Sequence, residues 1–270
     1  MKKKFEILMV ACLFISAFLL ARASAALTSS RHAASSKTCI VLDAGHGGSD
    51  PGKVGCNDAL EKDINLSIVL KLKTLFENKG YKVVLTRSDD TVPADENSHS
   101  VKVEDLRNRV KLITDTNPVM TISIHQNSFP DASVSGPQVF YFEQSAESSA
   151  IASVMQDTLN NSLNPPKPRV CKSNNDYYIL KKTPTPIIIV ECGFLSNETE
   201  AALLVTDAYQ EKLARAVYLG AITYLESGKD VPDTATYSVS LRNDILVTLD
   251  LKLFILCKLC TVVKNQYIGR

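Results

Sequence analysis

Short apolar runs alternate with longer amphipathic segments along most of the chain. The apolar runs, among them TCIVLD, VMTISIH and PIIIVE, are rich in β-branched residues and predict strands. Because polar residues hardly interrupt these runs, they are typical of strands that are covered on both faces. The predicted strands are Thr38–Asp43, Tyr81–Thr86, Val119–His125, Gln138–Phe142 and Ile187–Glu191.

The segments between the predicted strands carry a helical pattern. In the first of them, Ile64, Ile68, Leu72 and Leu75 recur at helical spacing, and Gly80 follows where such a helix would end. The alternation of strands and helices predicts an α/β fold, a three-layer sandwich with a mostly parallel central sheet flanked by helices. The predicted helices are Lys62–Asn78, Val103–Thr114, Ser148–Asn161 and Ala208–Glu226.

Two long polar loops interrupt this alternation, Asp89–Ser100 and Asn164–Tyr178, of which the second is rich in proline and asparagine. Loops of this length in a compact domain often act as lids or binding loops.

The first 25 residues have the pattern of a signal peptide. Three lysines precede an apolar stretch from Ile7 to Leu20, and Ala23-Ser24-Ala25 fits the small-residue cleavage motif. The alternative is an N-terminal membrane anchor, for which 14 apolar residues are few. In both cases we expect the folded part in an extracytoplasmic space, secreted or in the cell envelope, and cleavage of the signal peptide would leave the mature form without membrane attachment.

The remaining chain divides into three parts. Residues 26–37 are polar and predict a linker, and residues 38–228 hold the alternating elements of the predicted α/β domain. Residues 229–270 differ in composition and form a C-terminal extension to which we assign no role. Its apolar stretch, 245–263, contains charged residues that disfavour a membrane span.

Composition and charge exclude some classes of protein. Hydrophobic residues make up 45% and charged residues 22% of the chain, which is ordinary for a globular protein. Without the first 25 residues, 26 basic side chains oppose 28 acidic ones, so we expect no nucleic-acid partner. Six of the seven cysteines lie outside the signal-like segment. Their even number permits disulfides, but their spacing is not that of a dense disulfide scaffold.

Three predicted strands run out into side chains that can do chemistry: His46, His125 and Glu191. Ligands of open α/β sheets lie beyond the carboxyl ends of the strands, so these side chains are expected to converge there. Glu61, at the start of the first predicted helix, is 15 residues after His46 and can join them across a loop.

Each of these residues also has an ordinary interpretation. His46, in the run VLDAGHGG, can be a turn residue among glycines, and Glu61 can be a charge that suits a helix N-terminus. Glu191 is harder to explain in this way, because an unpaired carboxylate at the end of a buried strand is costly. Two histidines and one glutamate together form a coherent Zn²⁺ ligand set that leaves a fourth position for water. Glu191 is then available as a general base.

Five motifs in the same order resemble the zinc-dependent N-acetylmuramoyl-L-alanine amidases, the type 3 amidase family. They are VLDAGHGGSDPGKVG, EKDINLSIVLKL, VVLTRSDD, TISIHQNS and IIIVECGFLSN. The similarity spans residues 38 to 228. The segments KVEDLRNRVKLI and YYILKKTPTP most resemble the germination-specific, spore-cortex branch of the family.

The resemblance implies a role for each matching residue. It implies that His46, Glu61 and His125 bind Zn²⁺, that Glu191 is the catalytic glutamate, and that the substrate is peptidoglycan. The bond cut would be the amide between N-acetylmuramic acid and L-alanine of the stem peptide. Two readings stay open as alternatives, a zinc peptidase that cuts within the stem peptide and a non-catalytic wall-binding protein, and a protein activator is not identified.

Four further residues match the motifs with less defined roles. Asn127 and Arg87 are candidates for binding substrate, although for Arg87 and Asn65 a structural role in a salt bridge or at a helix start is at least an equal alternative. Asp43 or Asn65 is expected to hydrogen-bond the far edge of a metal ligand.

Overall fold

The computed structural model describes residues 38–95 and 100–227. Within this part of the chain a six-stranded sheet has the order β2-β1-β3-β6-β4-β5. Strands β2, β1, β3 and β6 are mutually parallel, and β4 is antiparallel to β6. The strands are β1 (Cys39–Ala44), β2 (Lys82–Leu85), β3 (Met120–Asn127), β4 (Gln138–Tyr141), β5 (Lys172–Ser173) and β6 (Ile187–Phe194).

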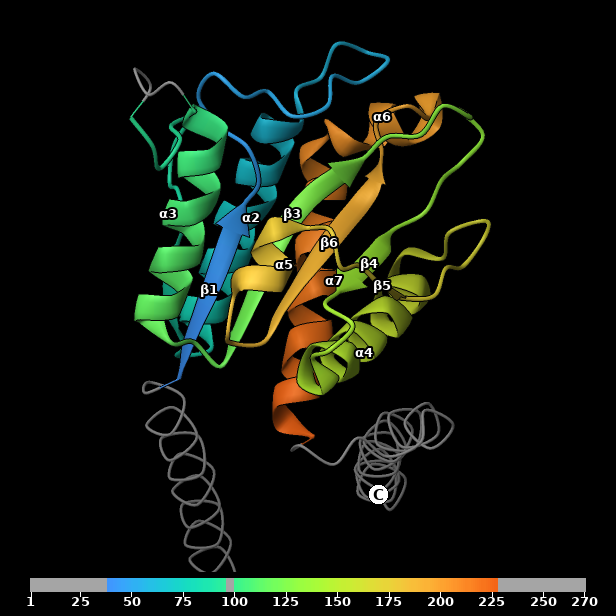
Figure 1. Ribbon diagram of the computed structural model, residues 1–270. Coiled ribbons are helices and arrows are strands. Elements are labelled where there is room, and N and C mark those ends of the chain that lie inside the picture. The colour runs from blue at the N-terminus through green and yellow to red at the C-terminus, as the bar shows by residue number, and fades with distance from the viewer. Residues whose placement is uncertain (1–37, 96–99, 228–270) are drawn as a thin grey trace, which may run out of the picture. The chain divides into compact units, whose positions relative to one another are not determined.

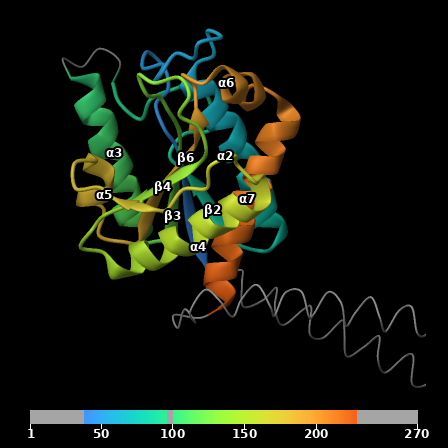
Figure 2. The ribbon, with the colours of Figure 1, turned by 90° about the vertical axis from the view of Figure 1, so that its right-hand side faces the viewer.

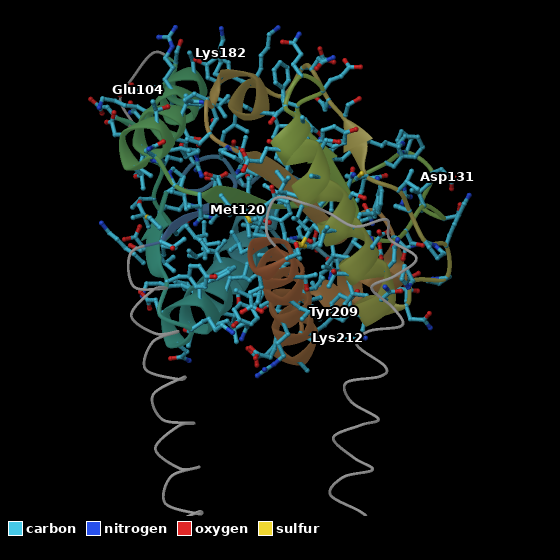
Figure 3. The ribbon with its side chains drawn as sticks, turned by 90° about the horizontal axis from the view of Figure 1, so that it is seen from below. Glu104, Met120, Asp131, Lys182, Tyr209 and Lys212 are labelled. Carbon is cyan, nitrogen blue, oxygen red and sulfur yellow. The ribbon has the colours of Figure 1, made fainter. Side chains whose placement is uncertain are left out.

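Helices cover both faces of the sheet. The helices are α2 (Glu61–Asn78), α3 (Val101–Thr116), α4 (Ala146–Leu163), α5 (Tyr178–Lys182), α6 (Glu198–Leu204) and α7 (Asp207–Glu226). Figure 2 shows α3 and α5 on one face and α2 and α7 on the other. In the view along the strands, Met120 lies between the layer that carries Glu104 and Lys182 and the layer that carries Tyr209 and Lys212 (Figure 3). The predicted three-layer α/β sandwich with a mostly parallel sheet is confirmed.

The apolar runs of the sequence form the strands at the centre of the hydrophobic core. In β1, β3 and β6 both alternating sets of side chains are buried, because helices cover both faces. On one face Val41 and Ile189 pack into a cluster with Ile113 of α3 and Ile179 of α5. This burial holds the three strands in register, so that their carboxyl ends lie together at one edge of the sheet (Figure 1).

All five predicted strands and four predicted helices are present, with ends that differ by at most three residues. The sequence pattern did not predict β5, α5 and α6, because two, five and seven residues are too few to display a period. The predicted loop 164–178 therefore contains a short strand and leads into a helix.

Several predictions concern residues outside the described part of the chain. These are the signal peptide or anchor (1–25), the linker (26–37) and the extension (229–270), which stay predictions. No helix among residues 38–95 and 100–227 is long and apolar enough to cross a membrane. The four cysteines described in the structure are free thiols: Cys39, Cys56, Cys171 and Cys192.

A buried ion pair joins α3 to the end of β1. Arg109 Nη1 lies 2.6 Å from Asp43 Oδ1, and both side chains are at most 2% exposed. Asp43 also accepts hydrogen bonds from Thr86 and Ser123. Burial alone would raise the pKa of Asp43, but Arg109 and its other partners outweigh this and lower the pKa to about 2.

We predict that Asp43→Asn lowers the free energy of unfolding by about 3 kcal/mol at pH 7, since it leaves a buried guanidinium undercompensated. The folded pKa of about 2 lies below the unfolded value of about 3.9. The carboxylate therefore stabilises the protein above about pH 4, and this contribution disappears as the pH falls toward 2. Urea unfolding should show the difference between wild type and variant narrow from pH 7 to pH 3.

Asp115→Asn is the matched control, because Asp115 pairs with Lys111 on the surface of α3 with more than half of each side chain exposed. Its free energy of unfolding should change by less than about 0.5 kcal/mol. Equal effects of the two substitutions would contradict the stabilising role of Asp43.

Candidate metal centre

The loop after β1 turns tightly and presents His46 at the carboxyl edge of the sheet. His46 has a left-handed backbone with φ +63°, and Gly47 and Asp50 exchange two backbone hydrogen bonds of 3.0 and 2.9 Å. This turn places Asp50 Oδ2 2.8 Å from His46 Nδ1. A histidine that donates from one ring nitrogen to a carboxylate presents the other nitrogen to a metal, here Nε2.

Glu61 is the first residue of α2 and is 2% exposed. Its Oε2 accepts a hydrogen bond of 2.8 Å from the backbone N–H of Lys53, and its Oε1 accepts one of 3.1 Å from the N–H of Gln126. These backbone donors fix the carboxylate, so that Oε1 lies 3.3 Å from His46 Nε2. The loop between β1 and α2 thus returns the helix start to the sheet edge, as the spacing predicts.

His125 lies near the end of β3, and its Nδ1 is 2.9 Å from Glu61 Oε1. Its ring lies against Gly45, where a Cβ atom would come within 2.1 to 2.6 Å of three ring atoms. Only glycine at position 45 leaves room for the imidazole. The glycines of VLDAGHGG therefore do more than permit a turn.

The three side chains fit a metal ion. One ligand atom each from His46, Glu61 and His125 lies within 4.8 Å of the others. Two imidazoles and one carboxylate form the donor set of many catalytic zinc sites, and N–O separations near 3 Å suit ligand bonds of about 2 Å. His46 and His125 cross at 79° with their centroids 5.1 Å apart, so both can face one point.

Charges in the cluster favour an anionic Glu61. Burial alone would raise its pKa, but hydrogen bonds to His125 and His46 hold the pKa far below the usual range. For His125 burial would lower the pKa, and the bond to Glu61 outweighs this and raises it to about 9. The carboxylate is therefore ready to ligate a cation.

Glu191 is the nearest neighbour of His125 on the adjacent strand, since the two residues pair in the register of β3 and β6. The side chain is buried, and its Oε2 has no hydrogen-bond partner among the described residues. Burial raises the pKa of Glu191 to about 7, with Glu61 adding to the effect and His125 opposing it. A buried carboxyl oxygen without a protein partner is what an acid–base group requires.

Two buried arginines support the His46 loop. Arg87 donates to the carbonyls of Ala44, Gly45, Lys62 and Asp89. Arg109 donates to the carbonyls of Ala44 and His46, at 2.7 and 2.8 Å. These contacts favour the structural alternative for Arg87 over substrate binding, because its donors face the protein backbone.

The other expected residues have different surroundings. Asn127 is partly exposed at the end of β3, and its side-chain oxygen accepts from the N–H of Ser128. Asn65 donates weakly to Glu61 at 3.4 Å and to Gly45 O at 3.1 Å, so it supports the carboxylate. Asp43 forms no hydrogen bond to His46 or His125 and instead pairs with Arg109.

Sequence reasoning missed Asp50 and Arg109. For Asp50 the sequence does contain a signal. It follows the candidate ligand His46 by four residues within GHGGSDPG, a spacing that a tight turn can bring into contact. For Arg109 the only signal in the sequence is that Asp105 precedes it by four residues, and this helical spacing also fits an exposed ion pair.

A mostly parallel sheet flanked by helices, with a His-Glu-His cluster and a buried glutamate near the carboxyl ends of its strands, is typical of a metal-dependent hydrolase. Comparison with known proteins identifies the family. The model of the N-acetylmuramoyl-L-alanine amidase family matches residues 40–223, and the chain belongs to this family.

Relatives within the family include one germination enzyme. The chain is 38% identical over 197 residues to the germination-specific N-acetylmuramoyl-L-alanine amidase of Bacillus subtilis, covering 72% of this chain and 82% of the relative. It is 30% identical over 187 residues to the amidase LytC of the same organism, covering 68% of this chain and 35% of LytC.

A solved structure of similar fold is the CwlD amidase from Clostridioides difficile in complex with the GerS lipoprotein. It is 40% identical with a TM-score of 0.68, over 71% of this chain and 100% of that chain. The amidase AmiC2 of Nostoc punctiforme is 30% identical with a TM-score of 0.62, over 70% and 98% of the two chains.

We predict that Asp50→Asn weakens Zn²⁺ binding about 10- to 100-fold, because Asn presents a neutral oxygen to His46 Nδ1 and orients the ring less firmly. Competition with a chromophoric chelator measures the dissociation constant. Asp58→Asn is the matched control, as Asp58 lies exposed in the same loop and the charge change is identical. A similar loss in both variants would assign the effect to net charge instead.

Proposed function

We propose that this protein is a zinc-dependent amidase that cleaves the bond between N-acetylmuramic acid and L-alanine in spore-cortex peptidoglycan. The observation that carries the proposal is the convergence of His46, Glu61 and His125, with Glu191 beside them on the sheet. Membership of the amidase family supports the bond, and 38% identity to a germination-specific enzyme supports the cortex.

In this proposal His46, Glu61 and His125 would hold the zinc ion, each through one ligand atom. A bound Zn²⁺ would supply Lewis acidity toward an amide carbonyl and toward a water molecule near neutral pH. Asp50 orients His46, and the backbone donors of Lys53 and Gln126 orient Glu61.

Glu191 transfers the proton between the attacking water and the leaving group. Its unpartnered Oε2 accepts a proton from the attacking water as the new C–O bond forms at the lactyl carbonyl carbon. As the C–N bond breaks, Glu191 returns this proton to the leaving nitrogen of L-alanine. A pKa near 7 allows both transfers at neutral pH, since it lies close to the operating pH.

Asn127 is partly exposed beside this centre, and we propose it as a contact for substrate. A substrate role for Arg87 would be indirect, through the loop that it supports.

The proposal also concerns the location of the protein and its binding partners. Peptidoglycan lies outside the cytoplasmic membrane, and the signal-like residues 1–25 support export. The CwlD amidase was solved in complex with a lipoprotein, which supports a protein partner for this chain as well.

Mass spectrometry of muropeptides after incubation with the zinc-loaded protein tests the function. Free stem peptides with intact N-terminal L-alanine are the expected product, and cortex fragments should be cut in preference to vegetative wall. Shortened stem peptides would replace the proposal by a peptidase, and binding without cleavage would replace it by a wall-binding protein.

We predict that Glu191→Gln lowers kcat by a factor on the order of 10²–10⁴ while zinc content stays unchanged, because the general base is lost and the ligands remain. His46→Ala and His125→Ala should lose both zinc and activity. Glu198→Gln, an exposed change of the same kind on α6, is the control. Loss of zinc in Glu191→Gln would make Glu191 a ligand instead.

A further inference from the structure

Tyr177 stands directly before α5, at the end of the predicted binding loop 164–178. Its backbone is fixed on both sides. Asn174 Oδ1 accepts hydrogen bonds from the N–H groups of Asp176 and Tyr177, at 2.9 and 2.8 Å, and Lys181 N–H donates to Tyr177 O at 3.1 Å. The position of this side chain is thus defined by the turn.

The ring of Tyr177 lies over the strand next to the one that carries Glu191. It meets the ring of Phe140 edge to face, with centroids 5.7 Å apart and an angle of 88°. Phe140 of β4 pairs with Ile189 of β6, and Gln138 pairs with Glu191. Because side chains alternate along strands, Phe140 projects from the same face as Glu191.

This face is the one that α5 covers, as α5 lies in front of the sheet beside β6 (Figure 1). Helix α5 contributes Ile179 to the cluster that contains Ile187 and Ile189 of β6. Packing of α5 therefore anchors the segment that begins with Tyr177 to β6, the strand that carries Glu191.

The Tyr177 phenol lies within the field of both carboxylates of the site. Burial, with the charges of Glu191 and Glu61, raises its pKa to about 12, so it is a neutral donor under working conditions. Among the described residues its hydroxyl has no hydrogen-bond partner, and 37% of the residue is exposed. The hydroxyl is thus free to meet a molecule from solvent.

We propose that the Tyr177 hydroxyl donates a hydrogen bond to the carbonyl oxygen of the scissile amide. The inference rests on the proposed function. Around an amide bond the carbonyl oxygen is the acceptor, so it is the group that a neutral phenol on the Glu191 face of the sheet can bind. The oxygen gains negative charge as the water attacks, and a donor aimed at it then contributes more than in the ground state.

The test is Tyr177→Phe, which removes the hydroxyl and keeps the ring contact with Phe140. We expect kcat on muropeptides to fall on the order of 10-fold, with KM changed less than about 3-fold, because the bond strengthens in the transition state. Zinc content and melting temperature should match wild type, since no protein hydrogen bond is lost. Tyr178→Phe is the matched control, because Tyr178 is the next residue and equally exposed.

Wild-type kcat in Tyr177→Phe, a change in KM alone, or an equal fall in Tyr178→Phe would overturn the inference. The comparison is made on whichever bond the wild type cuts. A wild type that releases shortened stem peptides would end the amidase proposal, yet the two kcat values would still decide the role of Tyr177.

Discussion

The geometry of the site depends on two buried guanidinium groups that hold one stretch of backbone. Arg87 and Arg109 together donate to the carbonyls of Ala44, Gly45 and His46, where β1 leaves the sheet. At that point the strand ladder no longer supplies N–H partners, and a buried carbonyl without a partner is costly. The arginines satisfy these groups and thereby fix the direction in which the His46 side chain leaves the sheet.

Two buried positive charges need negative charges nearby, and the fold supplies carboxylates from elements that are far apart in sequence. Asp43 on β1 and Asp105 on α3 both contact Arg109, and Asp43 in turn is bonded to β3 through Ser123. The same ion pairs therefore join three elements behind the metal cluster. Stability and function are coupled here, because a change that loosens this network also moves the backbone of His46.

The sequence predicted most of this arrangement for a physical reason. Apolar runs mark buried parallel strands, and parallel strands end at one edge, so His46, His125 and Glu191 were expected to meet. Asp50 and Arg109 were missed because their roles depend on a turn and on a contact 63 residues apart, between Arg109 and His46. Neither leaves a periodic pattern along the chain.

The two glutamates of the site lie at the same edge of the sheet but in surroundings that shift their pKa values in opposite directions. Glu61 is surrounded by imidazoles and backbone N–H groups, which hold its pKa low and keep it anionic, as a ligand must be. Glu191 follows the apolar run Ile187–Val190 within β6 and lacks such donors on Oε2, so burial raises its pKa. Carboxyl groups whose environments shift their pKa values in opposite directions are suited to different tasks. The proposed division into ligand and proton carrier follows from where each glutamate leaves the backbone.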